Sequence, residues 1–147
     1  MLTLVSRTEI RLFDVMYRLP REYVDEPVEP GGVTIGWLLW HLTRDLDQAA
    51  ARRTGDAQRW TAGGWPTRWG LDLDDADPDA TQLRTPGYDA IAGYHKMVTG
   101  WLRRDIWTPA ENDADNGLVA AAMRGVSDIG QAELLRDLHQ RRRGDTA

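Results

Sequence analysis

The sequence predicts an all-α protein, a bundle of four helices that forms a single domain over residues 1–147. Apolar residues return at steps of three and four in four separate segments, as on amphipathic helices. No Asn-Gly or Asp-Gly turn lies between two apolar, alternating runs, as a β-hairpin would require. The length suits one domain, and no linker or internal repeat divides it. Helices without strands favour a four-helix bundle.

The first two helices are predicted at about residues 3–19 and 34–53. Pro20 lies just beyond the first helix, where proline cannot continue it. Thr34 is the expected N-cap of the second helix, and Gly55 is its expected C-cap. The first half of the second helix is apolar on nearly all sides, which predicts a central, buried helix.

A long irregular connection, residues 56–86, is predicted between the second and third helices. Short helical turns are expected within it at 57–61 and 66–69. A connection of this length in a compact domain is typical of a lid or of a packed excursion. Its tryptophans, Trp60, Trp65 and Trp69, line a pocket, anchor an interface or merely seal the end of the bundle.

The last two helices are predicted at about residues 86–106 and 115–142. Thr85 is the expected cap of the third helix, and Pro86 suits its first turn. The stripe Ile91, Tyr94, Val98, Trp101 gives this helix an apolar face.

Composition excludes several classes of function. The net charge is −5 and the chain holds one lysine, so a nucleic-acid-binding surface is not expected. The absence of cysteine excludes disulfides and thiolate catalysis, and it is typical of a reducing compartment. No window of about 18 apolar residues exists that could span a membrane, and the N-terminus lacks the apolar centre of a signal peptide. We expect a cytoplasmic protein.

His41 interrupts the apolar run of the second helix. Helical spacing places Trp37, Arg44 and Gln48 on the same side of that helix, and Asp45 one turn beyond His41. A polar stripe that begins in an apolar segment needs partners. His41 could therefore be a metal ligand, a general base or a hydrogen-bonded core residue, and the spacing alone leaves these open.

The other two histidines give no metal motif by spacing. His95 lies beside the apolar stripe of the third helix, and His139 lies among arginines near the end of the fourth. Neither belongs to an HxxxH pair that would bring two imidazoles to one helix face. We expect both to be partly exposed surface residues.

The stretch "TIGWLLWHLTRDLDQ", followed by "GGWPTRWGLDLD" and "DIGQAELLRDL", resembles the DinB/YfiT-like superfamily. The nearest branches are similar to proteins related to mycothiol-dependent maleylpyruvate isomerase. The resemblance covers residues 33–138 approximately. It implies a four-helix bundle with a divalent metal, usually zinc or nickel, bound at its mouth. It also implies a thiol-using transferase or isomerase, although many members have no known activity.

The resemblance assigns His41 as the first metal ligand, from the second helix. The family's other ligands, a His or Glu and a His four residues apart on the last helix, fall on Arg124 and Asp128. Asp128 can coordinate a metal through oxygen, whereas the Arg124 guanidinium is a permanent cation and cannot. Arg124 and Asp128 are also spaced to pair with each other. We therefore expect weak or absent metal binding, with Arg124 taking the place of the cation in a polar cluster with His41 and Asp128 at one rim of the bundle.

Two functions follow. The first is a DinB-like transferase, isomerase or hydrolase with a degenerate metal site. With metal, His41 and Asp128 are ligands; without it, His41 is the acid–base and Arg124 binds a substrate carboxylate. The residues expected to hold a cofactor or substrate are Trp37, Arg44, Trp65 and Trp69. The alternative is a non-catalytic bundle that binds a small molecule or acts as a homodimer.

Overall fold

The computed structural model describes residues 2–17, 19–71, 87–106 and 116–145. Most of these residues are helical, and none of them forms a β-strand. The long helices are α1 (Leu2–Tyr17), α2 (Ile35–Thr54), α5 (Tyr88–Trp101) and α6 (Asn116–Asp145). The short ones are the 3-10 helix η1 (Arg21–Tyr23), α3 (Arg59–Ala62), α4 (Trp65–Arg68) and the π-helical turn η2 (Leu102–Ile106).

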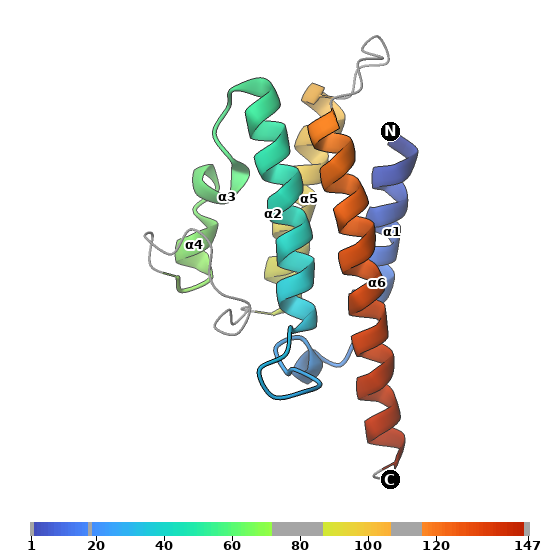
Figure 1. Cartoon of the computed structure of the whole chain (residues 1–147). Coiled ribbons are helices and arrows are strands. Elements are labelled where there is room, and N and C mark those ends of the chain that lie inside the picture. The colour runs from blue at the N-terminus through green and yellow to red at the C-terminus, as the bar shows by residue number, and fades with distance from the viewer. Residues whose placement is uncertain (1, 18, 72–86, 107–115, 146–147) are drawn as a thin grey trace.

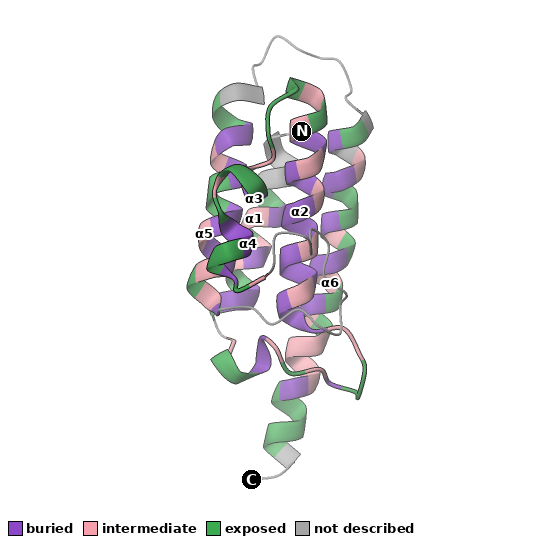
Figure 2. Ribbon diagram, turned by 90° about the vertical axis from the view of Figure 1, so that its left-hand side faces the viewer, coloured by how far each residue is buried: buried purple, intermediate pink, exposed green. Residues whose placement is uncertain are grey.

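The long helices lie side by side, with α2 at the centre of the arrangement (Figure 1). α2 packs against both α5 and α6, and α6 also packs against α1. α3 and α4 lie on the outer side of α2 and α5, and the C-terminal part of α6 extends beyond the other helices. The buried residues gather on the faces that the helices turn toward one another (Figure 2). No helix among the described residues is long and apolar enough to cross a membrane.

Both ends of α2 confirm the capping predicted from the sequence. The Thr34 hydroxyl accepts a hydrogen bond of 3.1 Å from the Trp37 N–H. Gly55 has a φ of 78°, a left-handed conformation that glycine adopts without strain, and its N–H reaches the Ala51 carbonyl at 2.8 Å. Between these caps, α2 buries the apolar residues expected of a central helix, among them Leu38, Leu42 and Leu46.

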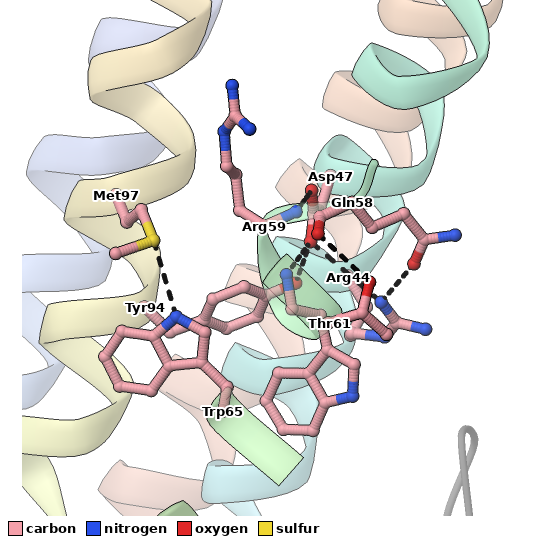
Figure 3. A network of polar contacts seen from close by, with 9 residues as sticks. Arg44, Asp47, Gln58, Arg59, Thr61, Trp65, Tyr94 and Met97 are labelled. Carbon is pink, nitrogen blue, oxygen red and sulfur yellow. Dashed lines mark hydrogen bonds and ion pairs between the residues drawn. The ribbon is translucent and has the colours of Figure 1, made fainter. Parts of the chain in front are cut away.

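The connection predicted at residues 56–86, here called the Trp-rich connection, contains in its first part the two helical turns that the sequence predicts, α3 and α4. Asp47 of α2 holds α3 in place, since its fully buried carboxylate accepts hydrogen bonds from the backbone N–H groups of Arg59 (2.7 Å) and Trp60 (2.8 Å). These are the first donors of α3, which have no partner within the helix. The same carboxylate accepts a 2.7 Å bond from the Tyr94 hydroxyl of α5 (Figure 3).

The tryptophans of this connection pack inward. Trp60 lies edge-on to Trp69, with ring centroids 5.3 Å apart, and both are buried in the core. Trp65 packs against Tyr94, and its Nε1 donates a 3.5 Å bond to the Met97 sulfur (Figure 3). Trp65 and Trp69 are therefore core residues, and α4, which carries Trp65, lies beside α2 and α5 rather than over the ends of the helices (Figure 1).

The expectation that His95 is a partly exposed residue is wrong, because its side chain is fully buried. The Thr43 hydroxyl donates to the Leu39 carbonyl (2.9 Å), so its oxygen accepts the His95 Nδ1–H at 2.9 Å. Burial lowers the pKa of His95 to about 4, and the positive charge of Arg103 adds to this shift. His95 is therefore a neutral core residue near pH 7.

The expectation of a partly exposed His139 is also wrong. Its ring stacks on Tyr23 with centroids 4.5 Å apart, and its Nε2 donates a 2.9 Å bond to the Glu26 carbonyl. The connection between α1 and α2 covers this part of α6, which helical periodicity could not reveal. The helix boundaries agree with the predictions within a few residues, except that η2 replaces the last α-helical turn predicted before residue 106. The predicted cap Thr85 and the adjoining Pro86 lie outside the described residues.

We predict that Asp47→Ala lowers the free energy of unfolding by about 3 kcal/mol, because it leaves two backbone donors and the Tyr94 hydroxyl buried without their acceptor. Urea unfolding followed by tryptophan fluorescence measures the change. Asp45→Ala is the matched control on the same helix. Its side chain pairs with the half-exposed Arg124, so its loss should cost less than about 1 kcal/mol. Equal costs for the two variants would contradict the role assigned to Asp47.

Candidate functional site

His41 and Asp128 meet between α2 and α6, as the sequence analysis predicts. The His41 Nδ1 lies 2.9 Å from Asp128 Oδ2, although 87 positions separate the two residues in the chain. The Asp128 side chain is 12% exposed, whereas the imidazole is 35% exposed. A largely buried carboxylate therefore holds a histidine that remains partly exposed to solvent.

The partner atoms fix the tautomer of the neutral imidazole. A carboxylate only accepts hydrogen bonds, so Nδ1 carries the proton and donates it to Asp128. Nε2 then keeps a lone pair when the ring is neutral. Trp37, one turn earlier on α2, stacks on the imidazole with ring centroids 4.5 Å apart and planes inclined by 16°. The ring is thus held on one edge by Asp128 and on one face by Trp37.

The environment raises the pKa of His41 above its ordinary value of 6.5. The hydrogen bond to Asp128 is the main cause, and the negative charges of Asp128 and Asp45 add to it. Partial burial and the positive charge of Arg124 act in the opposite direction. The protonated imidazole is therefore favoured more than in an isolated histidine.

Arg124 does not pair with Asp128, so that part of the prediction is wrong. Its Nε donates a 2.8 Å hydrogen bond to Asp45 Oδ2, across to α2. Helical spacing permits the pair within α6, but Asp128 is engaged by His41 and the longer Arg124 side chain reaches the next carboxylate along α2. Two cross-helix pairs therefore lie one helical turn apart, Asp128 with His41 and Arg124 with Asp45.

The described residues do not fit a metal site of three protein ligands. Nowhere in the described ranges do three histidine, aspartate or glutamate side chains gather around one point. His41 Nδ1 faces Asp128 rather than an open position, and the neighbouring Asp45 carboxylate is bound to an arginine. Zinc without cysteine ligands ordinarily takes three His or carboxylate donors, and a guanidinium cannot serve as one of them. The donor set therefore supplies two oriented groups instead of three.

The other site residues predicted from the sequence lie away from the His41–Asp128 pair. Arg44, which shares a face of α2 with His41, turns toward α3 and donates a 2.5 Å hydrogen bond to Gln58 Oε1. Trp65 and Trp69 belong to the core. Of the residues singled out by sequence, the structure brings Trp37, His41 and Asp128 into contact, with Arg124 one turn away through Asp45.

An open groove of about 670 Å³, which the sequence did not predict, lies between the C-terminal half of α2 and the segment that carries α3. Its walls include Arg44, Gln48, Arg52, Gln58 and Trp60. Arg44, Gln48 and Arg52 recur every four residues, so a polar row on α2 was visible in the sequence. Helical spacing could not show that α3 faces this row.

We predict that the His41–Asp128 pair stabilises the protein more at pH 5.5 than at pH 8.5. A histidine whose pKa is raised by folding contributes stability below its unfolded pKa, and this contribution is lost as the pH rises through the folded pKa. The cost of Asp128→Asn, measured by urea unfolding, should therefore be larger at pH 5.5. Because the imidazole is one-third exposed, the difference should be below about 1 kcal/mol.

Glu133→Gln provides the control for that measurement. It removes a different cross-helix pair of α6, in which Arg11 Nε of α1 donates a 3.0 Å bond to Glu133. Arg11 stays protonated throughout this pH range, so the cost of Glu133→Gln should not follow a histidine titration. An Asp128→Asn cost that is equal at the two pH values would refute the coupling between His41 and Asp128.

Comparisons with known proteins support the all-α fold and indicate no activity. No protein-family model and no curated protein matches this chain. Among solved structures, a crystal structure of a conserved protein from Enterococcus faecalis is similar, with a TM-score of 0.75 and 20% sequence identity over 92% of each chain. At this level of identity the likeness concerns the all-α fold alone.

Proposed function

We propose that this chain is a DinB-like four-helix bundle in which His41, oriented by Asp128, acts as a general acid–base on a small-molecule substrate. The observation that carries the proposal is the 2.9 Å contact between a largely buried carboxylate and a partly exposed imidazole. An imidazole held at Nδ1 by a carboxylate presents Nε2 for proton transfer, which is the arrangement that catalytic histidines use.

The electrostatics of the pair suit this role. Asp128 stabilises the imidazolium that forms when Nε2 takes a proton, and it keeps the neutral ring in one tautomer. A histidine with a moderately raised pKa changes protonation state close to neutral pH, where it can serve both as acid and as base. Trp37 restricts rotation of the ring and provides an apolar surface beside it.

Arg124 is the candidate for substrate positioning. Its side chain is 52% exposed, and Asp45 engages it through Nε. A guanidinium offers five N–H donors and pairs well with a substrate carboxylate. Because Arg124 lies one turn from the His41–Asp128 pair, an acid bound there would bring its neighbouring atoms toward the imidazole.

The zinc or nickel implied by the family resemblance is not part of this proposal. His41 and Asp128 would be the two protein ligands, and a bound divalent ion would supply Lewis-acid activation of a substrate or water. The donor set argues against tight metal binding, since Arg124, a permanent cation, occupies the position of the third ligand in the family. The transferase, isomerase or hydrolase reaction we favour is therefore metal-independent, and a thiol, if one takes part, would be a substrate.

A non-catalytic bundle is the second candidate, and one observation favours it. Large apolar side chains are exposed on α1 and α6, namely Ile10, Met123 and Leu134. Such residues are common at the interfaces of homodimers. A dimer that binds a small molecule without transforming it would also account for the groove beside α3.

We predict that the protein hydrolyses an activated ester, 4-nitrophenyl acetate, and that His41→Gln slows this reaction at least about tenfold. His41 is the histidine with an open imidazole, because His95 and His139 are buried. The rate should rise with pH as His41 loses its proton, and Asp128→Asn should lower it. Release of 4-nitrophenolate measures the rate.

Arg141→Gln, an exposed change on α6, serves as the control and should leave the rate unchanged. Treatment with a chelator, together with metal analysis of protein purified without a chelating column, tests the metal alternative. Equal rates for the wild type and His41→Gln would contradict the acid–base role. A rate abolished by chelation and restored by zinc or nickel would replace our proposal with the metal-dependent one.

A further inference from the structure

The outer face of α1 exposes large apolar side chains. α1 lies at the edge of the helical arrangement, beside α6 (Figure 1). Helical spacing places Arg7, Ile10, Asp14 and Tyr17 on one face of this helix, and all four residues are exposed. Ile10 is 67% exposed and Tyr17 is 81% exposed, whereas Leu12 on the opposite face is buried in the core. Two large apolar side chains on one solvent face indicate a contact surface.

A groove lies next to Ile10, between α1 and α6. It has a volume of about 410 Å³, and its walls include Arg7, Ile10 and Val126. Val126 is half-buried, and Met123, one turn earlier on α6, is 62% exposed. The surface therefore has a projecting apolar side chain beside a recess with an apolar wall. Such a surface can pair with itself, because each copy supplies the side chain that the recess of the other copy receives.

The charges on this face favour antiparallel pairing of two copies of α1. Arg7 and Asp14 lie on the same face, two helical turns apart, and the midpoint between them falls beside Ile10. A two-fold axis at this midpoint places each Arg7 opposite Asp14 of the second copy. The same axis brings the two Ile10 side chains together. A parallel pairing in register would instead place like charges side by side.

Both charged groups are available for this contact. The Asp14 side chain is 70% exposed, and its ion pair with Arg136 spans 3.8 Å, which is longer than a hydrogen bond. Arg136 has a closer partner in Asp137, at 3.1 Å. Arg7 is exposed at the wall of the groove. An exposed ion pair of this length contributes little to stability, so Asp14 can accept a hydrogen bond from a second copy at small cost.

We infer that the outer face of α1 is the interface of a homodimer, in which two copies of this chain pack antiparallel with Ile10 at the two-fold axis. α1 is only about 24 Å long. Even with Met123 and Val126 it offers less area than the ~1,600 Å² of a standard interface, so the dimer is a reversible one. We expect a dissociation constant of about 10–100 µM.

This interface is separate from the other features described above. His41 and Asp128 meet between α2 and α6, away from the outer face of α1. The dimer is therefore expected whether or not His41 is catalytic, and it requires neither copy to complete the site of the other. Measurements of association test the interface without reference to any activity.

Sedimentation equilibrium of the full chain tests the inference over about 5–500 µM, a range that brackets the expected dissociation constant. Ile10→Asp should weaken association at least about tenfold, because it places two like charges at the axis. Leu134→Asp is the matched control, since it makes the same change at an apolar residue of α6 that is 58% exposed. It should associate like the wild type. Near-ultraviolet circular dichroism checks that each variant is folded.

An exchange of charges tests the antiparallel geometry. Arg7→Asp and Asp14→Arg each place like charges in both contacts of the dimer, so each variant alone should be monomeric over this range. In an equimolar mixture the two variants should form a heterodimer, because both contacts then join opposite charges. Arg141→Gln, an exposed change near the end of α6, should dimerise like the wild type.

Three results would overturn the inference. The first is a wild-type protein that stays monomeric up to about 500 µM, well above the expected dissociation constant. The second is a wild-type dimer that Leu134→Asp disrupts and Ile10→Asp does not, which would place the contact on another face of the molecule. The third is failure of Arg7→Asp and Asp14→Arg to associate with each other, which would exclude the antiparallel arrangement.

Discussion

The buried carboxylate of Asp47 is the constraint on which this arrangement depends. A charge with no exposure is tolerated only when hydrogen bonds replace its lost hydration, and Asp47 obtains them from the start of α3 and from Tyr94 of α5. It thereby fixes the Trp-rich segment against α2 and α5. As a consequence, Trp60 and Gln58 lie beside Arg44.

α2 serves three different environments on its separate faces. Its apolar face fills the core, a second face binds α3 through Asp47, and a third faces α6 through His41 and Asp45. The polar contacts of the last two faces differ in burial. Asp47 is fully enclosed, whereas the His41 imidazole remains partly exposed, as the proposed acid–base role requires.

The sequence was most informative where a local rule determines the structure. The Thr34 and Gly55 caps and the meeting of His41 with Asp128 were predicted, the last from a family resemblance. The partner of Arg124 was not predicted correctly, because two carboxylates lie within reach of its side chain. Only the packing of α6 on α2 selects between them. The burial of His95 escaped prediction for a similar reason, since spacing does not show which helix covers a residue near the edge of an apolar stripe.

The central claim is that Asp128 holds His41 with its proton on Nδ1 and raises its pKa. Long-range ¹H–¹⁵N correlation spectra of the imidazole, recorded between pH 5 and 9, measure both quantities. We predict a neutral ring protonated at Nδ1 and a titration midpoint above 6.5 for His41. A neutral ring protonated at Nε2, or a midpoint below 6.5, would contradict it.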